Sequence, residues 1–127
     1  MKEAIMFKKV AFTMYPVTDV ARARRFYGET LGLEESSVGH EGDRYWIEYD
    51  LPGGGCLALS NFTGDTPSDS AGGTIALEVE DLDRLMAELK AKGVVFTSDV
   101  IVTPVCRMAV CRDSEGNALL LHQLNPR

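Results

Sequence analysis

Apolar and polar positions near the N-terminus alternate in a way that predicts a strand followed by a helix. In the segment FTMYPVTDVARARRFYGETLGL, which starts at Phe12, the strand pattern continues to Val17. Asp19 is a suitable N-cap, the apolar positions after it have helical spacing, and Gly32 is placed to end the helix. We therefore expect a strand, an acidic cap, a helix and a glycine stop.

The same order of signals recurs 62 residues later. The segment TIALEVEDLDRLMAELKAKGVV starts at Thr74, Asp81 can cap its helix, and Gly93 closes it. Phe12 and Thr74 are 62 positions apart, and so are Asp19 and Asp81. A shared offset of this kind indicates an internal repeat.

Strand patterns follow each predicted helix, at about 33–40, 44–51 and 56–62 in the first half and 94–97, 105–112 and 118–124 in the second. Both halves therefore read β-α-β-β-β. A chain of 127 residues has the length of one domain. We expect an α+β domain over residues 1–127, with module 1 at about 6–62, a linker at 63–73 and module 2 at about 74–124.

Charge and composition argue against two kinds of partner. The net charge of −6 argues against nucleic acid, because binding to a phosphate backbone depends on clustered Lys and Arg. The one basic cluster, Arg22, Arg24 and Arg25, is expected to be a solvated helix face. No apolar run is long enough to span a bilayer, so no membrane partner is expected. The acidic balance permits a cationic small molecule as ligand.

Cysteine usage indicates a reducing compartment. The three cysteines are an odd number, and the N-terminal MKEAIMFKK lacks the apolar core of a signal peptide. We expect no disulfide and a cytoplasmic location.

Two segments resemble a known family. MYPVTDVARARRFYGETLGLE contains the first strand and helix, and RDSEGNALLLHQ resembles the family's Asp-Pro-Asp-Gly-Asn turn, with Ser114 and Glu115 as departures. With the tandem β-α-β-β-β pattern, the chain resembles the vicinal oxygen chelate superfamily of glyoxalase I (a lactoylglutathione lyase), bleomycin-resistance proteins and extradiol dioxygenases. The resemblance implies a curled mixed sheet, or partial barrel, around a groove. It does not determine the reaction, because this fold serves several chemistries as well as pure binding.

The family's enzymes hold a divalent metal with His, Gln or Glu from the first and last strands of each half. Aligned on the motifs, these positions fall at Phe12, Ala58, Thr74 and Leu120, and the offset of 62 relates Phe12 to Thr74 and Ala58 to Leu120. Three of the four side chains have no donor atom, and the neutral hydroxyl of Thr74 is a poor ligand. The expectation is therefore no metal and no other cofactor.

Strand alternation predicts which other residues share a face with these positions. Leu119 and Leu121 are expected in the core. The further residues expected to line the groove are Met14, Trp46, Glu48, Ser60, Glu78 and His122. Each also has a structural interpretation: the large apolar side chains as interior filling, the carboxylates as solvated rim groups, and the histidine as a partly exposed strand end. A relocated metal site would require the three ionisable side chains of this set to converge.

Three functional hypotheses follow. The first is a metal-independent protein of the bleomycin-resistance type that binds a small organic molecule, antibiotic-like or cationic. The second is a lyase, isomerase or dioxygenase with a relocated metal or none, using His122 or Glu78 as general base. The third is an interaction module. The first is favoured because the metal donors are lost together while the fold signal is kept. We also expect a homodimer, because open half-barrels leave sheet edges and apolar surface that pairing covers.

Overall fold

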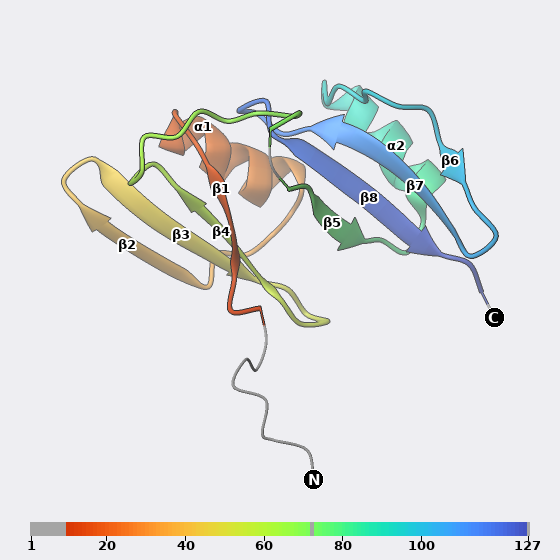
Figure 1. The fold of residues 1–127 in the computed structure, drawn as a ribbon, viewed down its shortest axis with the longest axis horizontal. Coiled ribbons are helices and arrows are strands. Elements are labelled where there is room, and N and C mark those ends of the chain that lie inside the picture. The colour runs from red at the N-terminus through yellow and green to blue at the C-terminus, as the bar shows by residue number, and fades with distance from the viewer. Residues whose placement is uncertain (1–9, 72, 127) are drawn as a thin grey trace, which may run out of the picture.

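The computed structural model describes residues 10–71 and 73–126, which form two four-stranded mixed sheets that are not closed into a barrel. The first sheet has the order β1-β4-β3-β2, with β1 at Thr13–Pro16, β2 at Ser37–Glu41, β3 at Arg44–Asp50 and β4 at Cys56–Ser60. The second has the order β5-β8-β7-β6, with β5 at Ile75–Glu78, β6 at Ile101–Val102, β7 at Cys106–Arg112 and β8 at Ala118–Leu124. The two sheets lie side by side (Figure 1). The α+β fold class is confirmed.

Strand register repeats at the predicted offset. β1 runs parallel to β4 with Met14 opposite Ala58, and β5 runs parallel to β8 with Ala76 opposite Leu120. Both residues of the second pair stand 62 positions after those of the first, and the first and last residues of β3 and β7 are also 62 positions apart. The internal repeat is therefore a property of the backbone pairing.

Each half carries one helix after its first strand, and an aspartate caps it as predicted. Asp19 precedes α1 (Val20–Arg25) and Asp81 precedes α2 (Leu82–Ala91). Each carboxylate accepts a hydrogen bond from the backbone N–H three positions on, at 3.0 Å and 3.1 Å respectively. In the described part of the chain, no helix is long and apolar enough to cross a membrane.

The helix of the first half ends in a wider turn than expected. α1 continues into the π-helical segment η1 (Phe26–Thr30), and the backbone then reverses at Gly32, whose φ of +75° favours glycine. Gly93 has a similar φ of +88° after α2. Both predicted glycine stops are therefore correct.

The predicted strand at 94–97 is reduced to an isolated bridge to β7, beside which the Thr97 N–H donates to the Val110 oxygen at 2.9 Å and the Val95 oxygen accepts from the Arg112 N–H at 3.0 Å. Only Phe96 forms an isolated bridge to β7, and the edge strand of this sheet is the two-residue β6 instead. At the end of this short ladder, the Val110 N–H donates to the Ser98 hydroxyl at 2.9 Å and not to a backbone carbonyl. The expected start of module 1 at about residue 6 lies outside the described residues.

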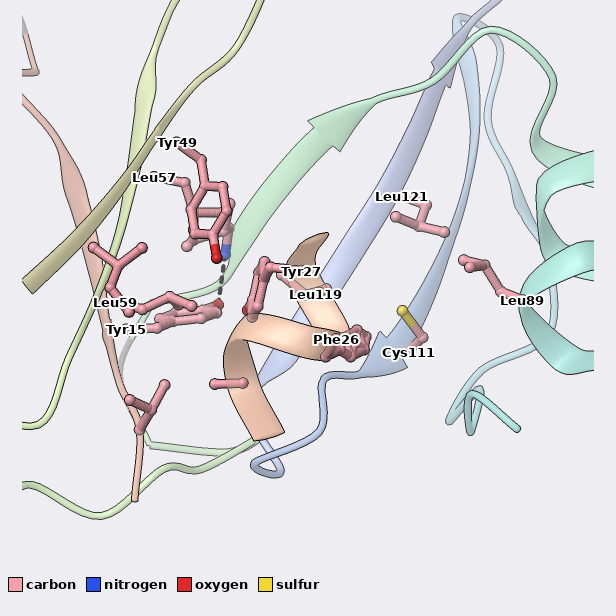
Figure 2. Close-up of a cluster of buried hydrophobic side chains, with 14 of the residues drawn as sticks. Tyr15, Phe26, Tyr27, Tyr49, Leu57, Leu59, Leu89, Cys111, Leu119 and Leu121 are labelled. Atoms are coloured by element: carbon pink, nitrogen blue, oxygen red, sulfur yellow. Dashed lines mark hydrogen bonds between the residues drawn. The ribbon is translucent and has the colours of Figure 1, made fainter. Parts of the chain in front are cut away.

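The core lies between the helices and the sheets, and Tyr15 joins the two halves within it. Figure 2 shows side chains from both halves gathered around η1, including Tyr27 and Leu119. The Tyr15 hydroxyl donates to the backbone oxygen of Ala118 at 2.6 Å and accepts from the N–H of Ile75 at 2.7 Å. One phenol therefore connects β1 to β5 and β8 of the second sheet.

The turn at 113–117 (DSEGN) forms a second connection between the halves. The Tyr27 hydroxyl donates to Asp113 at 2.8 Å, and burial together with this carboxylate raises the pKa of Tyr27 well above its ordinary value. Asn117 donates to the backbone oxygen of Pro16 at 3.0 Å. The turn is thus a contact surface for the first half.

Glu115, one of the departures from the family turn, lies at the start of α1. Its side chain is fully buried and accepts hydrogen bonds from the backbone N–H groups of Thr18 and Asp19, at 3.1 Å and 2.9 Å. It also accepts from Arg22 at 2.7 Å and 3.1 Å. Burial alone would raise the pKa of the Glu115 carboxyl, but these donors, led by Arg22, lower it to about 2.

The basic cluster lies on a solvated helix face as expected, with the Arg22 and Arg24 side chains 49% and 38% exposed, but these two arginines also form ion pairs. Arg22 pairs with Glu115, and Arg24 donates twice to Glu35, both times at 2.7 Å. Of the cluster, Arg25 alone has no carboxylate partner among the described residues. Sequence spacing could not reveal these pairs because the carboxylates come from other elements.

Candidate functional site

The candidate site is the face of each sheet that the helices leave uncovered, here called the open face. On β8, Leu119 and Leu121 are 0% and 1% exposed and belong to the core, while Leu120 and His122 on the other face are partly exposed. On β3, Ile47 belongs to the core in the same way. The predicted strand faces are correct.

In the first sheet, aromatic and acidic side chains gather on the open face. Phe12, just before β1, contacts Trp46 edge to face, with ring centroids 5.0 Å apart. The Trp46 indole N–H donates to Glu48 at 2.7 Å, and the Cys56 thiol lies 3.7 Å from the other carboxylate oxygen. Because both oxygens have a partner, the carboxylate is held in one orientation beside the indole.

Small residues form the floor of this open face. Ala58 is paired with Met14 on one side and Glu48 on the other, and Ser60 is paired with Trp46. Cross-strand partners share a face, so the larger neighbours cover both small side chains, which are buried. A ligand on this face would therefore contact Met14, Trp46 and Glu48 rather than the floor.

A hollow of about 310 Å³ opens beside Glu48. Its lining includes a second carboxylate, Asp50, together with Cys56 and the turn residues Gly54 and Gly55. Desolvation, with Glu48 nearby, raises the pKa of the Cys56 thiol to about 11, so this cysteine is a poor nucleophile at neutral pH. Sequence reasoning had not placed Cys56 in the site, although a short hairpin after β3 is a signal that could have done so.

In the second sheet, a carboxylate and an imidazole form a pair on the open face. His122 Nδ1 lies 2.6 Å from one oxygen of Glu78, and the other oxygen accepts from the Leu124 N–H at 2.8 Å. These two hydrogen bonds, His122 first, lower the pKa of the Glu78 carboxyl. Thr74 is exposed and precedes β5, just as Phe12 precedes β1.

The structure thus brings the predicted site residues together in two groups, one on each sheet. The first group is Phe12, Met14, Trp46, Glu48, Ala58 and Ser60, and the second is Thr74, Glu78, Leu120 and His122. Three surface hollows stand out over the described residues, and Glu48 is the one predicted site residue that lines any of them. Within one chain, none of these three hollows is therefore lined by residues from both groups.

The four positions implied for a metal do not fit one. Phe12, Ala58 and Leu120 offer no donor atom, and Thr74 offers a neutral hydroxyl. Within residues 10–71 and 73–126, no group of three or more His, Cys, Asp or Glu side chains is arranged to hold a metal ion. Glu48 accordingly does not join Glu78 and His122 in a cluster of that kind.

The chain is similar to known proteins over most of its length. The family model "Glyoxalase/Bleomycin resistance protein/Dioxygenase superfamily" matches residues 9–121. The crystal structure of TnmS3, an antibiotic binding protein from Streptomyces sp. CB03234, superposes with a TM-score of 0.81 at 27% identity, covering 96% of this chain and 100% of that one. No curated protein matches the sequence significantly.

Two further solved structures are similar. A glyoxalase/bleomycin resistance protein from Streptomyces sp. CB03234 has a TM-score of 0.72 at 29% identity, covering 87% of this chain and 96% of that one. A member of the same superfamily from Sphaerobacter thermophilus DSM 20745 has a TM-score of 0.77 at 26% identity, covering 94% and 99%.

Proposed function

Because the chain belongs to the Glyoxalase/Bleomycin resistance protein/Dioxygenase superfamily, we propose that it is a metal-independent protein that sequesters a small organic ligand. The observation that carries the proposal is the donor set: three of the four implied metal positions have no ligand atom, and the fourth has only a neutral hydroxyl. The similarity to an antibiotic binding protein supports an antibiotic-like ligand.

The open face of the first sheet supports an aromatic, cationic ligand. Phe12, 45% exposed, and Trp46 offer aromatic edges and faces to a flat molecule. Glu48 beside the indole, with Asp50 in the adjoining hollow, favours a positive group on that molecule. Burying about 200 Å² of apolar ligand surface would contribute about 5 kcal/mol before the entropic costs of association.

We propose further that the working form is a homodimer in a reducing cytoplasm. The two groups of open-face residues share none of the hollows described above, so a second copy would complete each site by setting one sheet against the other. Exposed apolar residues on the surface, such as Leu124 at 59%, would be covered by such pairing. The three cysteines of the chain are free, which suits a reducing compartment.

The single tryptophan makes the test direct, because Trp46 reports the proposed site without labelling. We expect a cationic aromatic compound, taken from a panel of antibiotics, to change Trp46 fluorescence with one-to-one stoichiometry. Glu48→Gln should weaken this binding about tenfold, since a charged contact is lost. Glu34→Gln, which removes an exposed carboxylate without a hydrogen-bonded role in the site, should bind as the parent does.

Two results would overturn the proposal. The first is a panel in which no compound changes Trp46 fluorescence while the protein is folded. The second is calorimetric titration with Zn²⁺ or Ni²⁺ that shows one-to-one binding in the micromolar range or better. A sedimentation result of a strict monomer, with and without ligand, would contradict the dimer.

The enzyme hypothesis has one observation in its favour, the Glu78–His122 pair at 2.6 Å. A carboxylate that orients an imidazole is an arrangement suited to general base catalysis. Turnover of an α-hydroxy carbonyl substrate that is lost in His122→Gln would favour this hypothesis over sequestration.

A further inference from the structure

A cationic cleft lies on the helix side of the molecule, away from the open faces. It has a volume of about 480 Å³ and is formed where the first half meets the second. Its walls are α1 with η1, the loop after α2 and the turn after β7. None of the predicted site residues lines it.

The lining of this cleft is positive although the protein as a whole is acidic. Four basic side chains line it, Arg22, Arg25, Lys92 and Arg112, against one carboxylate, Asp113. The net charge of the chain is −6, so this concentration of positive charge stands out from the composition. Basic side chains gathered at a concave surface raise the local concentration of anions.

Two of these cations already have partners. Arg22 is paired with Glu115 and Arg112 with Asp69, each at 2.7 Å. Asp113 is also fully engaged, because it accepts from Tyr27 and from three N–H groups of its own turn. These groups form a fixed wall and leave the remaining two cations to act on a ligand.

Arg25 and Lys92 are the two cations available to a ligand, and they come from opposite halves. Both are exposed, and neither has a carboxylate partner among the described residues. The Lys92 ammonium has one long hydrogen bond, 3.5 Å, to the backbone oxygen of Thr30. Two unpaired cations across a cleft can grip one anion between them.

The end of α2 does not oppose an anion strongly. Its last carbonyl groups would carry partial negative charge, but those of Glu88, Leu89 and Lys90 accept hydrogen bonds from the N–H groups of residues 92–94. Apolar side chains complete the lining, namely Phe26, Val94 and Val95, of which Val95 is 56% exposed. The cleft therefore offers two cationic side chains beside an apolar surface.

We propose that this cleft binds a small organic anion, a phosphate or carboxylate attached to an apolar body, held between Arg25 and Lys92. The site is distinct from the open faces, so the inference stands or falls independently of the proposed function. Because each half supplies one of the cations, the bound anion links module 1 to module 2 and stabilises their junction.

Calorimetric titration with phenyl phosphate tests this inference. We expect one-to-one binding with a dissociation constant of about 1 mM or below, weaker binding of inorganic phosphate, and no binding of phenol. Benzoate against benzyl alcohol distinguishes a carboxylate in the same way. Affinity should fall as NaCl rises from about 20 mM to about 200 mM, because the cations are exposed.

The double variant Arg25→Gln/Lys92→Gln should lose affinity for phenyl phosphate at least about tenfold. Arg84→Gln/Lys90→Gln is the matched control, since it removes the same charge from α2 outside the cleft and should bind as the parent does. Absence of binding by the parent, or equal loss in both double variants, would overturn the inference. So would binding that changes Trp46 fluorescence and is insensitive to Arg25→Gln/Lys92→Gln, because the anion would then lie on the open face.

Discussion

Replacing Glu115 with glutamine tests whether the turn at residues 113–117 holds the two halves together. The carboxylate is buried and faces donors from the start of α1: two backbone N–H groups, the hydroxyl of Thr18 and the guanidinium of Arg22. Glutamine preserves the shape of the side chain but removes the charge. One of its terminal atoms becomes an N–H group that faces other donors.

The expected cost follows from the pKa. The carboxyl has a pKa of about 2 in place of the ordinary 4.5, and this gap corresponds to about 3 kcal/mol. Arg22 is 49% exposed, so solvent screening reduces the figure to about 2 kcal/mol. For a chain of 127 residues, a loss of this size lowers the melting temperature by about 8 °C.

The stabilisation by Glu115 depends on pH, and the direction follows from its lowered pKa. The folded-state pKa of Glu115 is depressed, so its stabilisation is complete above about pH 4.5 and is lost as the pH falls toward about 2. The variant has no ionisable group at this position. The difference in the free energy of unfolding between parent and Glu115→Gln should therefore shrink as the pH is lowered from 7 to about 2.5.

Urea denaturation at several pH values and fixed protein concentration measures this difference. Glu88→Gln is the control, because Glu88 is 54% exposed and pairs with Arg84 at 3.2 Å on the surface of α2. It should cost no more than about 0.5 kcal/mol. A difference for Glu115→Gln that stays constant across the pH range, or that is no larger than the control at pH 7, would refute the reasoning.

Two further substitutions examine the core and the strand register. Tyr27→Phe removes the hydroxyl that donates to Asp113 and should lower the free energy of unfolding by about 1–3 kcal/mol, whereas Tyr45→Phe should change it little; equal effects would contradict the role of the buried hydrogen bond. Leu121→Ala should cost about 2–5 kcal/mol, because this side chain is 1% exposed, whereas Leu120→Ala on the open face should cost clearly less. If Leu120→Ala lowered the free energy of unfolding more than Leu121→Ala, the assignment of Leu121 to the core would be wrong.

The sequence by itself determined the elements and their repetition. Asp19 and Asp81 cap helices, Gly32 and Gly93 end them, and the register of 62 residues runs through the paired strands. Caps, glycine stops and strand alternation depend on neighbouring residues, so they can be recognised in a single sequence. For the same reason, Leu119 and Leu121 could be assigned to the core from alternation alone.

Where local pattern competes with a contact from elsewhere, the sequence was a poorer guide. Residues 94–97 have a strand-like pattern, yet they form only an isolated bridge to β7, where the Val110 N–H donates to the Ser98 hydroxyl. Arg22 belongs to a run of arginines that is solvated as predicted, but the sequence did not reveal its ion pair with Glu115, 93 positions away. The spacing of residues in the sequence identifies neither the partner of Arg22 nor that of Val110, because a contact between distant segments depends on how the backbone is folded.

Tertiary structure alone decided how the site residues are grouped. Alternation places Trp46 and Glu48 on one face and Glu78 and His122 on another, but it carries no information on the angle between two sheets. The structure pairs Trp46 with Glu48 and His122 with Glu78, and leaves the two pairs on separate sheets. The orientation of the sheets is set by the shared core and by the contacts of Tyr15 and Glu115 with the other half, and these arise only when segments far apart in sequence pack together.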